Sequence, residues 1–399
     1  MKLISKLGFD KMGIWGDAYF RGITNRREDL DLKLSRRQKV SLVGCLVLAG
    51  VAILVITQVN VSPVEAVGAS PSAEKTIRYI RERFAIPDSQ NLTLGPFQEA
   101  AYPGYYQATM TVDEGKEKKL QKISVSANSR YLILSDFVPL GSDTQAELTR
   151  RIAEIFKVPA GVKLSVGPFI NSPYPGFLQT TLTANDGKRD QKQNYFVTRD
   201  KHYFVLGTIY NMDVEPRRLA LQTIKLEDQP SQGPANAPVT IVEYADLECP
   251  TCAREHAFMQ EELLPRYGGK LRIIYKEFPL QGHPWSMTAA IANQCAYQLD
   301  PSKYVAYRSS IFEHQQSITL TSARDLLLYY GQQVGLDKLK LAACVDSKAS
   351  LPRVEANLHE AQKLEVDRTP TFFINGRKLI GGPPDQFIEL IDEALRASR

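Results

Sequence analysis

The chain has 399 residues, of which 43% are hydrophobic and 23% charged, and its formal net charge is +5. This length exceeds what one hydrophobic core usually organises, so we expect two or three domains, and the composition excludes collagen-like, largely disordered and disulfide-dense proteins. The basic excess lies in residues 1–39, which hold ten Lys or Arg and five Asp or Glu. An excess confined to one short segment does not indicate a nucleic-acid-binding surface, so no nucleic-acid partner is expected.

An uncharged apolar run follows over residues 40–59 (VSLVGCLVLAGVAILVITQV). About 20 apolar residues are enough to cross a bilayer as a helix, so this run predicts a single transmembrane helix. Three basic residues stand directly before it, and no Lys or Arg follows until Lys75. The positive-inside rule therefore makes residues 1–39 a cytoplasmic basic tail and places the later domains outside the cytoplasm. A cleaved signal peptide is the alternative, but the apolar run and its leader are too long for one.

The next part of the chain repeats itself at an offset of 72 residues (167 − 95 = 72). The tripeptide Gly-Pro-Phe at 95–97 recurs at 167–169, and Tyr-Pro-Gly at 102–104 recurs at 174–176. A register shared over this length indicates an internal duplication.

Two α+β repeat units are predicted from this duplication, over residues 73–141 and 145–213. Each opens with a helical pattern closed by a proline and continues with alternating strands, which predicts one helix on a small antiparallel sheet. This layout, with a Pro-Gly-aromatic entry into the first long strand, resembles the cystatin-like N-terminal dimerisation domain of disulfide isomerases of the DsbC/DsbG type. Two such copies within one chain could pack as an internal pseudo-dimer. A spacer that holds the next domain off the membrane is the alternative.

Residues 214–233 are rich in Pro, Gln and Gly, which predicts a linker. The segment after it, PVTIVEYADLECPTCAREHAFM (238–259), predicts a buried strand, a short loop and a helix that begins at the cysteines. Cys249 would then lie at a helix N-terminus, where unpaired N–H groups and the helix dipole stabilise a thiolate, and Cys252 could resolve a mixed disulfide. The same spacing fits half of a zinc site, but apart from His256 no other Cys or His lies near, so no metal is expected.

A second marker lies at residues 366–395. It predicts a loop with Thr369-Pro370, a hairpin that turns at Asn375-Gly376, and a terminal amphipathic helix, which together are typical of the closing half of a thioredoxin fold. With CPTC after VEYADLE, these features resemble the DsbA-like branch of the thioredoxin superfamily over residues 234–399. The resemblance implies an α/β thioredoxin-like domain with a helical insertion at about 283–365.

The resemblance also implies which residues form the site. The catalytic group would consist of Cys249, Cys252, Glu243 and Pro370, with Pro370 as the cis-proline and Glu243 as the buried acid that transfers protons. The substrate would be bound by Pro250, Thr251 and Thr369. A structural disulfide would join Cys295 and Cys344. A buried ionisable group is expensive without a purpose, although a partly exposed structural Glu243 is the alternative. In an oxidising compartment a disulfide is the expected state of Cys295 and Cys344, and two buried free thiols are the alternative. The histidines are assigned no role.

These expectations describe a thiol-disulfide oxidoreductase of the bacterial inner membrane, with its C-terminal domains in the periplasm, that exchanges disulfides with protein substrates. Without a Gly-rich nucleotide fingerprint, the Cys249–Cys252 pair is the only expected redox group, recycled by a membrane redox partner. Pro250-Thr251 replaces the Pro-His of strongly oxidising relatives, so a less oxidising couple is expected. The oxidase direction is favoured over reductase or isomerase, and a non-enzymatic chaperone or docking module is the alternative.

Overall fold

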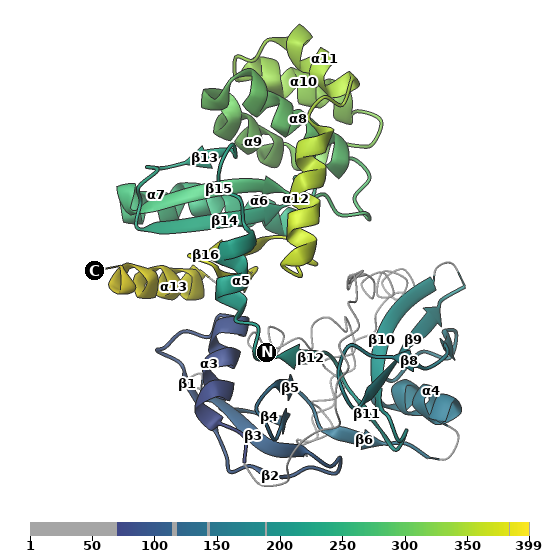
Figure 1. Ribbon diagram of the computed structural model, residues 1–399. Helices are drawn as coiled ribbons and strands as arrows, with labels where there is room; N and C mark the ends of the chain where they lie inside the picture. The colour runs from purple at the N-terminus through teal and green to yellow at the C-terminus, as the bar shows by residue number, and fades with distance from the viewer. Residues whose placement is uncertain (1–69, 114–117, 142–143, 188–189, 383, 399) are drawn as a thin grey trace, which may run out of the picture. The chain divides into compact units, whose positions relative to one another are not determined.

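The structure, a computed structural model, describes residues 70–113, 118–141, 144–187, 190–382 and 384–398 (Figure 1). The described chain forms two compact units, one made of the residues before Ile80 with 89–214, and one made of 80–88 with the residues from Glu215 onward. The predicted tail (1–39) and transmembrane helix (40–59) lie outside the described residues. Among those described, no helix combines the length and apolar character needed to span a bilayer.

The first unit contains two α+β repeats with the same order of elements (Figure 1). The first repeat consists of α3 (Ala73–Phe84), β1 (Asn91–Leu94), β2 (Gln98–Glu99), β3 (Tyr105–Asp113), β4 (Lys118–Ser126), β5 (Tyr131–Ile133) and β6 (Phe137–Pro139). The second consists of α4 (Thr144–Ile155), β7 (Lys163–Val166), β8 (Ile170–Asn171), β9 (Phe177–Asn185), β10 (Asp190–Thr198), β11 (Tyr203–Val205) and β12 (Ile209–Asn211).

The two repeats exchange their last strands. The strand β6 pairs with β11 of the second repeat, with Phe137 opposite Val205, and β12 pairs with β5 of the first repeat, with Ile209 opposite Ile133. The sheet orders are therefore β1-β3-β4-β5-β12, with β2 on β3, and β6-β11-β10-β9-β7, with β8 on β9. The sequence predicted one helix on a small antiparallel sheet for each copy, and in the structure each sheet covers an otherwise open edge with a strand from the other repeat.

An aromatic core joins the repeats where the strands cross over. Tyr105 and Phe137 of the first repeat and Phe177 of the second are buried together, and the rings of Tyr105 and Phe177 meet edge to face at 5.8 Å. The hydroxyl of Tyr102 donates to the carbonyl of Gly176 at 2.9 Å.

Residues 80–88, predicted as part of the first repeat, belong to the second unit, where Gln386 donates to the Ala85 carbonyl at 2.7 Å.

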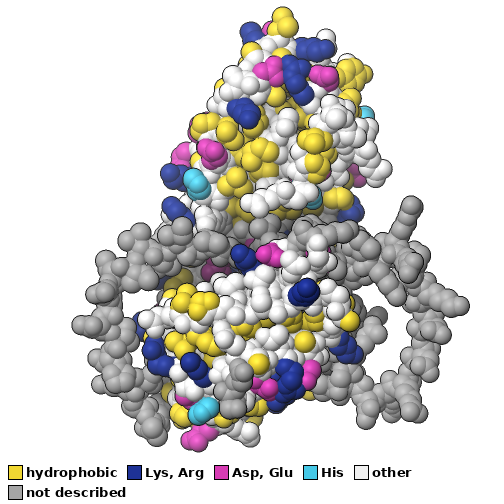
Figure 2. Space-filling view, turned by 90° about the vertical axis from the view of Figure 1, so that its right-hand side faces the viewer, with side chains coloured by type: hydrophobic (Ala, Val, Ile, Leu, Met, Phe, Trp, Pro, Cys, Tyr) yellow, Lys and Arg dark blue, Asp and Glu magenta, His cyan; other side chains and the backbone are white. Residues whose placement is uncertain are grey.

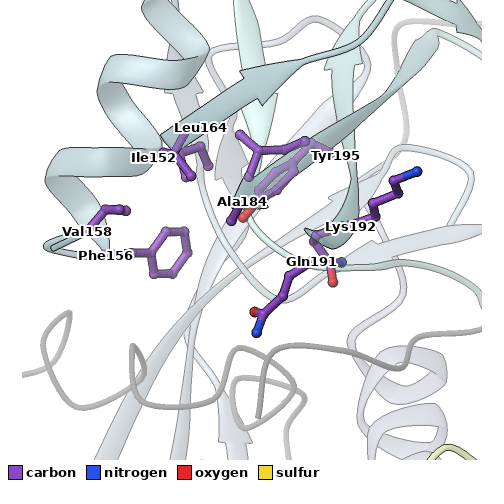
Figure 3. A pocket seen from close by; sticks show the side chains of 10 residues that line it. Ile152, Phe156, Val158, Leu164, Ala184, Gln191, Lys192 and Tyr195 are labelled. Atoms are coloured by element: carbon purple, nitrogen blue, oxygen red, sulfur yellow. The ribbon is translucent and has the colours of Figure 1, made fainter. Parts of the chain in front are cut away.

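An apolar pocket lies between α4 and the sheet of the second repeat (Figure 3). Ile152 of α4 and Phe156 directly after it line one side, and Ala184 from β9 and Tyr195 from β10 line the other. The corresponding residues of the first repeat, 72 positions earlier, include Val112 where the second repeat has Ala184.

A five-stranded mixed sheet, in the order β13-β15-β14-β16-β17, forms the centre of the second unit. Its central strands β14 and β15 are parallel, whereas β13, β16 and β17 run antiparallel to their neighbours. The bounds are β13 (Ser231–Gln232), β14 (Val239–Ala245), β15 (Leu271–Glu277), β16 (Thr371–Ile374) and β17 (Arg377–Ile380). β14 and β16 are buried on both faces, as the continuous apolar runs of β14 and β16 require.

Helices cover both faces of this sheet. One face packs against α6 (Pro250–Phe258), a π-helical turn (Met259–Leu263), α7 (Leu264–Tyr267) and α13 (Pro384–Ala397). The other face packs against α5 (Pro216–Thr223) and α12 (Leu351–Lys363). Figure 1 shows α12 running from the sheet to the helices of the insertion.

The segment 214–233 was predicted to be a linker, but all of it from Glu215 onward is part of the second unit. It contains α5, which contacts β17 and buries Ala220 completely, and β13, which pairs with β15. The Pro and Gly content suggested a linker. The segment instead packs on the second unit because α5 buries apolar side chains and β13 pairs with an open edge of the sheet.

The predicted helical insertion lies between β15 and β16. It contains α8 (Ser286–Leu299), α9 (Tyr304–Glu313), α10 (Ala323–Gln333), α11 (Lys338–Asp346) and α12, with 3₁₀ turns at Pro301–Lys303 and Gln315–Ser317. Another 3₁₀ turn, at Gly268–Lys270, lies before β15 and outside the insertion. Cys295 of α8 and Cys344 of α11 form the disulfide expected from the sequence, with their Cα atoms 6.0 Å apart. Hydrophobic side chains lie among charged ones on the surface of this helical lobe (Figure 2), where Leu320 and Leu339 are the most exposed.

Candidate active site

Cys249 and Cys252 lie where β14 leads into α6. Cys249 is the N-cap residue of α6, with φ −78° and ψ 120°, and Pro250 follows in the first turn. Proline suits this position because the N–H it lacks would have no helical partner. Both cysteines are free and buried, and the Asp246 backbone N–H points at the Cys252 sulfur from 3.5 Å. The predicted strand-loop-helix arrangement is present.

The surroundings of Cys249 favour its thiolate. A hydrogen bond from the Cys252 side chain lowers the pKa of Cys249 to about 5, with further lowering by Thr369 and by the backbone N–H groups of Cys252 and Thr251, against the opposing effect of burial. These donors at the start of α6 are the unpaired N–H groups that any helix N-terminus offers an anion. Of the two thiols, Cys249 is therefore the one more readily ionised.

Cys252 has the opposite character. Burial raises its pKa well above the ordinary value, and the neighbouring Cys249 and the charge of Glu243 act in the same direction. Cys252 is completely buried, and in the reduced form it is a neutral thiol that donates to Cys249.

The Thr369–Pro370 turn faces the cysteines. Its peptide bond is cis, and the Cys249 sulfur lies 3.8 Å from the Thr369 carbonyl oxygen. Pro370 leads into β16, where Thr371 pairs with Tyr244 of β14. Thus the sheet brings together two segments 120 residues apart in the chain. Pro250 is exposed beside the pair, which leaves its side accessible to another polypeptide.

Glu243 is fully buried on β14, so the partly exposed alternative is wrong. Its Oε2 accepts a hydrogen bond from Nη2 of Arg308, at 3.0 Å, and Arg308 of α9 is also fully buried. Burial raises the pKa of Glu243, and the charge of Glu277 raises it further while Arg308 opposes both. The charge of Glu243 in turn contributes to the raised pKa of Cys252.

Asp246 and His283 were missed by sequence reasoning. His283 Nδ1 lies 2.7 Å from Asp246 Oδ2, and the same carboxylate accepts from the Leu280 N–H at 2.9 Å and the Ser286 hydroxyl at 2.6 Å. The hydrogen bond to Asp246 raises the pKa of His283, and the negative charge of Cys249 raises it further. Asp246 stands at the end of a strand and three residues before Cys249, so its position in the sequence could have indicated a place in the site. The position of His283 in the sequence could not.

This fold and site define a thioredoxin-like domain. Residues 225–393 match the protein family described as Thioredoxin. Among curated proteins, the chain is 32% identical over 165 residues to the Na(+)/H(+) antiporter NhaA of Herminiimonas arsenicoxydans, and 31% over 150 residues to Na(+)/H(+) antiporter NhaA 1 of Mycobacterium sp. (strain KMS). These matches cover 41% and 37% of this chain but only 25% and 23% of the relatives.

The chain also has partial structural similarity to solved proteins. Oxidised BdbD from Bacillus subtilis has 23% identity and a TM-score of 0.41, covering 43% of this chain and 95% of that protein. Wolbachia pipientis alpha-DsbA1 has 22% identity and a TM-score of 0.41, covering 45% of this chain and 96% of that protein.

Proposed function

We propose that this chain is a membrane-anchored thiol-disulfide oxidoreductase that acts on protein substrates in the periplasm. The observation that carries the proposal is an acidic thiol at the start of α6, with a buried neutral thiol three residues later, opposite the Thr369–Pro370 turn. The Cys249 thiolate attacks a substrate disulfide, or, in the oxidised pair, the Cys249 sulfur is attacked by a substrate thiolate. In the first case Cys252 then attacks the Cys249 sulfur of the mixed disulfide and releases the reduced substrate. In the second case Cys252 leaves as a thiolate, and a second substrate thiol attacks the mixed disulfide and releases Cys249.

The remaining parts of the proposal rest on the sequence. The apolar run 40–59 after a basic tail supports a single inner-membrane anchor with the C-terminal domains outside the cytoplasm. The cysteine pair is the only redox group that the reaction needs, so its electrons pass to or from a membrane redox partner. Thr369, Pro250 and Thr251 border the pair and would contact the substrate chain.

The Cys249→Ser variant tests whether the protein is an enzyme. We expect loss of disulfide exchange with a dithiol peptide, because serine has no thiolate to form the mixed disulfide. The Cys252→Ser variant, treated with a disulfide-bonded peptide, should instead accumulate the mixed disulfide between Cys249 and the peptide, because the resolving thiol is missing. Replacement of the distant pair, Cys295→Ala with Cys344→Ala, is the control and should leave the exchange chemistry in place. If Cys249→Ser retained full exchange, the proposal would fail.

The reduction potential tests the direction of electron flow. A thiol with a pKa of about 5 lies between those of thioredoxin, roughly 7, and DsbA, roughly 3.5, so we expect a potential between about −270 and about −120 mV. Equilibration of the protein with glutathione buffers measures it. A value nearer −120 mV supports the oxidase direction that we favour, and a value nearer −270 mV would reassign the protein as a reductant.

A second candidate function rests on the first unit. Its two repeats resemble the DsbC/DsbG dimerisation domain, and they pack together through exchanged strands and a shared aromatic core. This arrangement favours an isomerase, or a chaperone-like docking module, built on an internal pseudo-dimer. If the Cys249→Ser variant still suppressed the aggregation of a reduced substrate protein, this result would support the docking role.

A further inference from the structure

The segment that joins β15 to α8 is tied to the turn before the cysteine pair through one carboxylate. Asp246 follows β14 directly and is buried. Its side chain accepts hydrogen bonds from the Leu280 N–H at 2.9 Å and the Ser286 hydroxyl at 2.6 Å, and His283 Nδ1 lies 2.7 Å from it. All three partners come from the same segment. Asp246 therefore fixes the position of the His283 ring.

The backbone of Asp246 contacts both cysteines. Its N–H lies 3.5 Å from the Cys252 sulfur, and its carbonyl accepts from the Cys249 N–H at 3.1 Å. A second tie runs beside this one, where the Trp285 N–H donates to the Glu248 carboxylate at 2.7 Å. Trp285 and Cys249 also belong to one buried hydrophobic cluster. These two ties hold the segment with the imidazole against the turn that leads into the pair.

The ring of His283 can carry a charge in this place. A carboxylate only accepts hydrogen bonds, so Nδ1 donates to Asp246, and Nε2 is the nitrogen that gains or loses a proton. The His283 side chain is 28% exposed, so solvent can supply that proton. The charged groups that act on the ring among the described residues are Asp246, Glu248 and Cys249, and all three are negative and favour the imidazolium.

The interaction between His283 and Cys249 is mutual. Because the Cys249 thiolate raises the pKa of His283, the imidazolium must stabilise the thiolate by the same free energy. The carboxylates of Asp246 and Glu248 do not cancel this effect. They are present whether or not the ring is protonated, so protonation adds one positive charge beside the thiolate in either case. In the disulfide form Cys249 has no charge, and the interaction is absent.

We propose that His283, held by Asp246, is a positioning residue whose charge couples the redox state of the cysteine pair to pH. Protonation of His283 stabilises the reduced pair, and reduction of the pair favours protonation of His283. This inference deepens the proposed thiol-disulfide exchange and rests on it. The charge comes from the segment after β15 and not from the dipeptide between the cysteines, which is Pro250-Thr251.

Electrons and protons balance as follows when the oxidised pair accepts electrons. A substrate dithiol gives up two electrons and two protons as its sulfurs form a disulfide bond. The electrons break the Cys249–Cys252 bond, and one proton makes Cys252 a neutral thiol, while Cys249 remains a thiolate. The second proton binds Nε2 of His283 if the ring was neutral, and passes to solvent if the ring was already protonated. In the reverse direction the same protons are released.

NMR titration of the full chain, labelled with ¹³C-histidine, tests the coupling without a substitution. We expect His283 to bind its proton about threefold or more tightly in the reduced protein than in the oxidised protein, because only the reduced protein has the Cys249 thiolate. The His283→Gln variant identifies the signal by its loss. If His283 only held the segment in place, its titration would be the same in both redox states.

Alkylation of Cys249 supplies a second readout. His283→Gln keeps a donor for Asp246 but has no charge, so the midpoint of the labelling profile should rise above about 5. The thiolate fraction at pH 5 should then fall about threefold or more. His283→Lys restores a positive charge and should return the midpoint toward the wild-type value. The control is His359→Gln, an exposed residue of α12 on the other face of the sheet, which should leave the midpoint unchanged.

The equilibrium with glutathione should change in the same sense. At pH 6 the disulfide of His283→Gln should be favoured about threefold over that of the wild type, which is a potential more negative by about 14 mV. The difference should shrink as the pH rises and the wild-type ring loses its proton. A packing role for His283 alone would give the same difference at every pH.

Two results would overturn the inference: an identical titration of His283 in the reduced and oxidised proteins, or an unchanged Cys249 midpoint in His283→Gln. Neither measurement needs a protein substrate, so the two proposals fail separately. A redox-dependent titration in a protein that does not exchange disulfides with a dithiol peptide would reject the proposed function alone. Exchange without a redox-dependent titration would reject the coupling alone.

Discussion

Alkylation of Cys249 in the reduced protein should follow a pH profile with its midpoint at about 5, far below the roughly 8.5 of an ordinary cysteine. At pH 5.5 most of Cys249 is then thiolate, whereas about one free thiol in a thousand is ionised. A less basic thiolate is also a weaker nucleophile, with a Brønsted coefficient of about 0.5. The advantage over an ordinary thiol is therefore largest in acid. Iodoacetamide labelling from pH 4 to 9, followed by mass spectrometry, measures the profile.

The Cys252→Ala variant separates the causes of this shift. The hydrogen bond from Cys252 makes the largest contribution to the low pKa of Cys249, so the midpoint should rise when that donor is removed. The backbone N–H groups at the start of α6 remain, so it should stay below that of the protein unfolded in denaturant. Cys252 itself should resist labelling, because it is buried and its pKa is raised. A midpoint near 8.5 in the folded wild-type protein would remove the basis for the assigned nucleophile.

The Arg308→Met variant should lower the stability of the thioredoxin-like domain by about 3–5 kcal/mol, because it leaves Glu243 and Glu277 buried without their cation. For a domain of this size, the expected fall in melting temperature is about 6–20 °C. Thermal unfolding followed by circular dichroism measures the change. Glu243→Gln in the same chain should restore part of the loss, because one uncompensated charge is then removed.

The loss should also depend on pH. Burial raises the pKa values of Glu243 and Glu277 in the folded protein above the roughly 4.3 of an unfolded glutamate. The folded state then binds more protons than the unfolded state, so stability is retained at pH values below about 4.3 and is lost as the pH rises through the folded pKa values. The destabilisation by Arg308→Met should thus be larger at pH 8 than at pH 5. An equal loss at both values would mean that the arginine acts through packing alone.

Local sequence patterns were sufficient for much of the catalytic unit. The apolar strand before CPTC, the helix that begins at Cys249, the Thr369-Pro370 turn and the hairpin at Asn375-Gly376 all depend on near neighbours. Each signal is short-range, since helix starts, turns and alternating strands follow from residues a few positions apart. The identity of the acid on β14 could be predicted for the same reason, because a glutamate within a buried strand is conspicuous.

The partners of that acid could not be predicted. Arg308 lies 65 residues after Glu243 and looked like an ordinary charged residue on a helix, yet α9 places it in the core. Likewise, His283 could be assigned no role until the loop after β15 brought it to Asp246. Pairings of this kind depend on which helix packs on which strand.

The repeats illustrate the same division on a larger scale. The duplication at an offset of 72 residues (167 − 95 = 72) was evident from the sequence by itself, and so were the helix and strands of each copy. The exchange of β6 and β12 between the sheets, and the inclusion of residues 215–233 in the thioredoxin-like unit, were decided only by the tertiary structure. Strand composition predicts that a segment will pair, but the pairing partner is chosen by which open edge the folded chain brings within hydrogen-bonding reach.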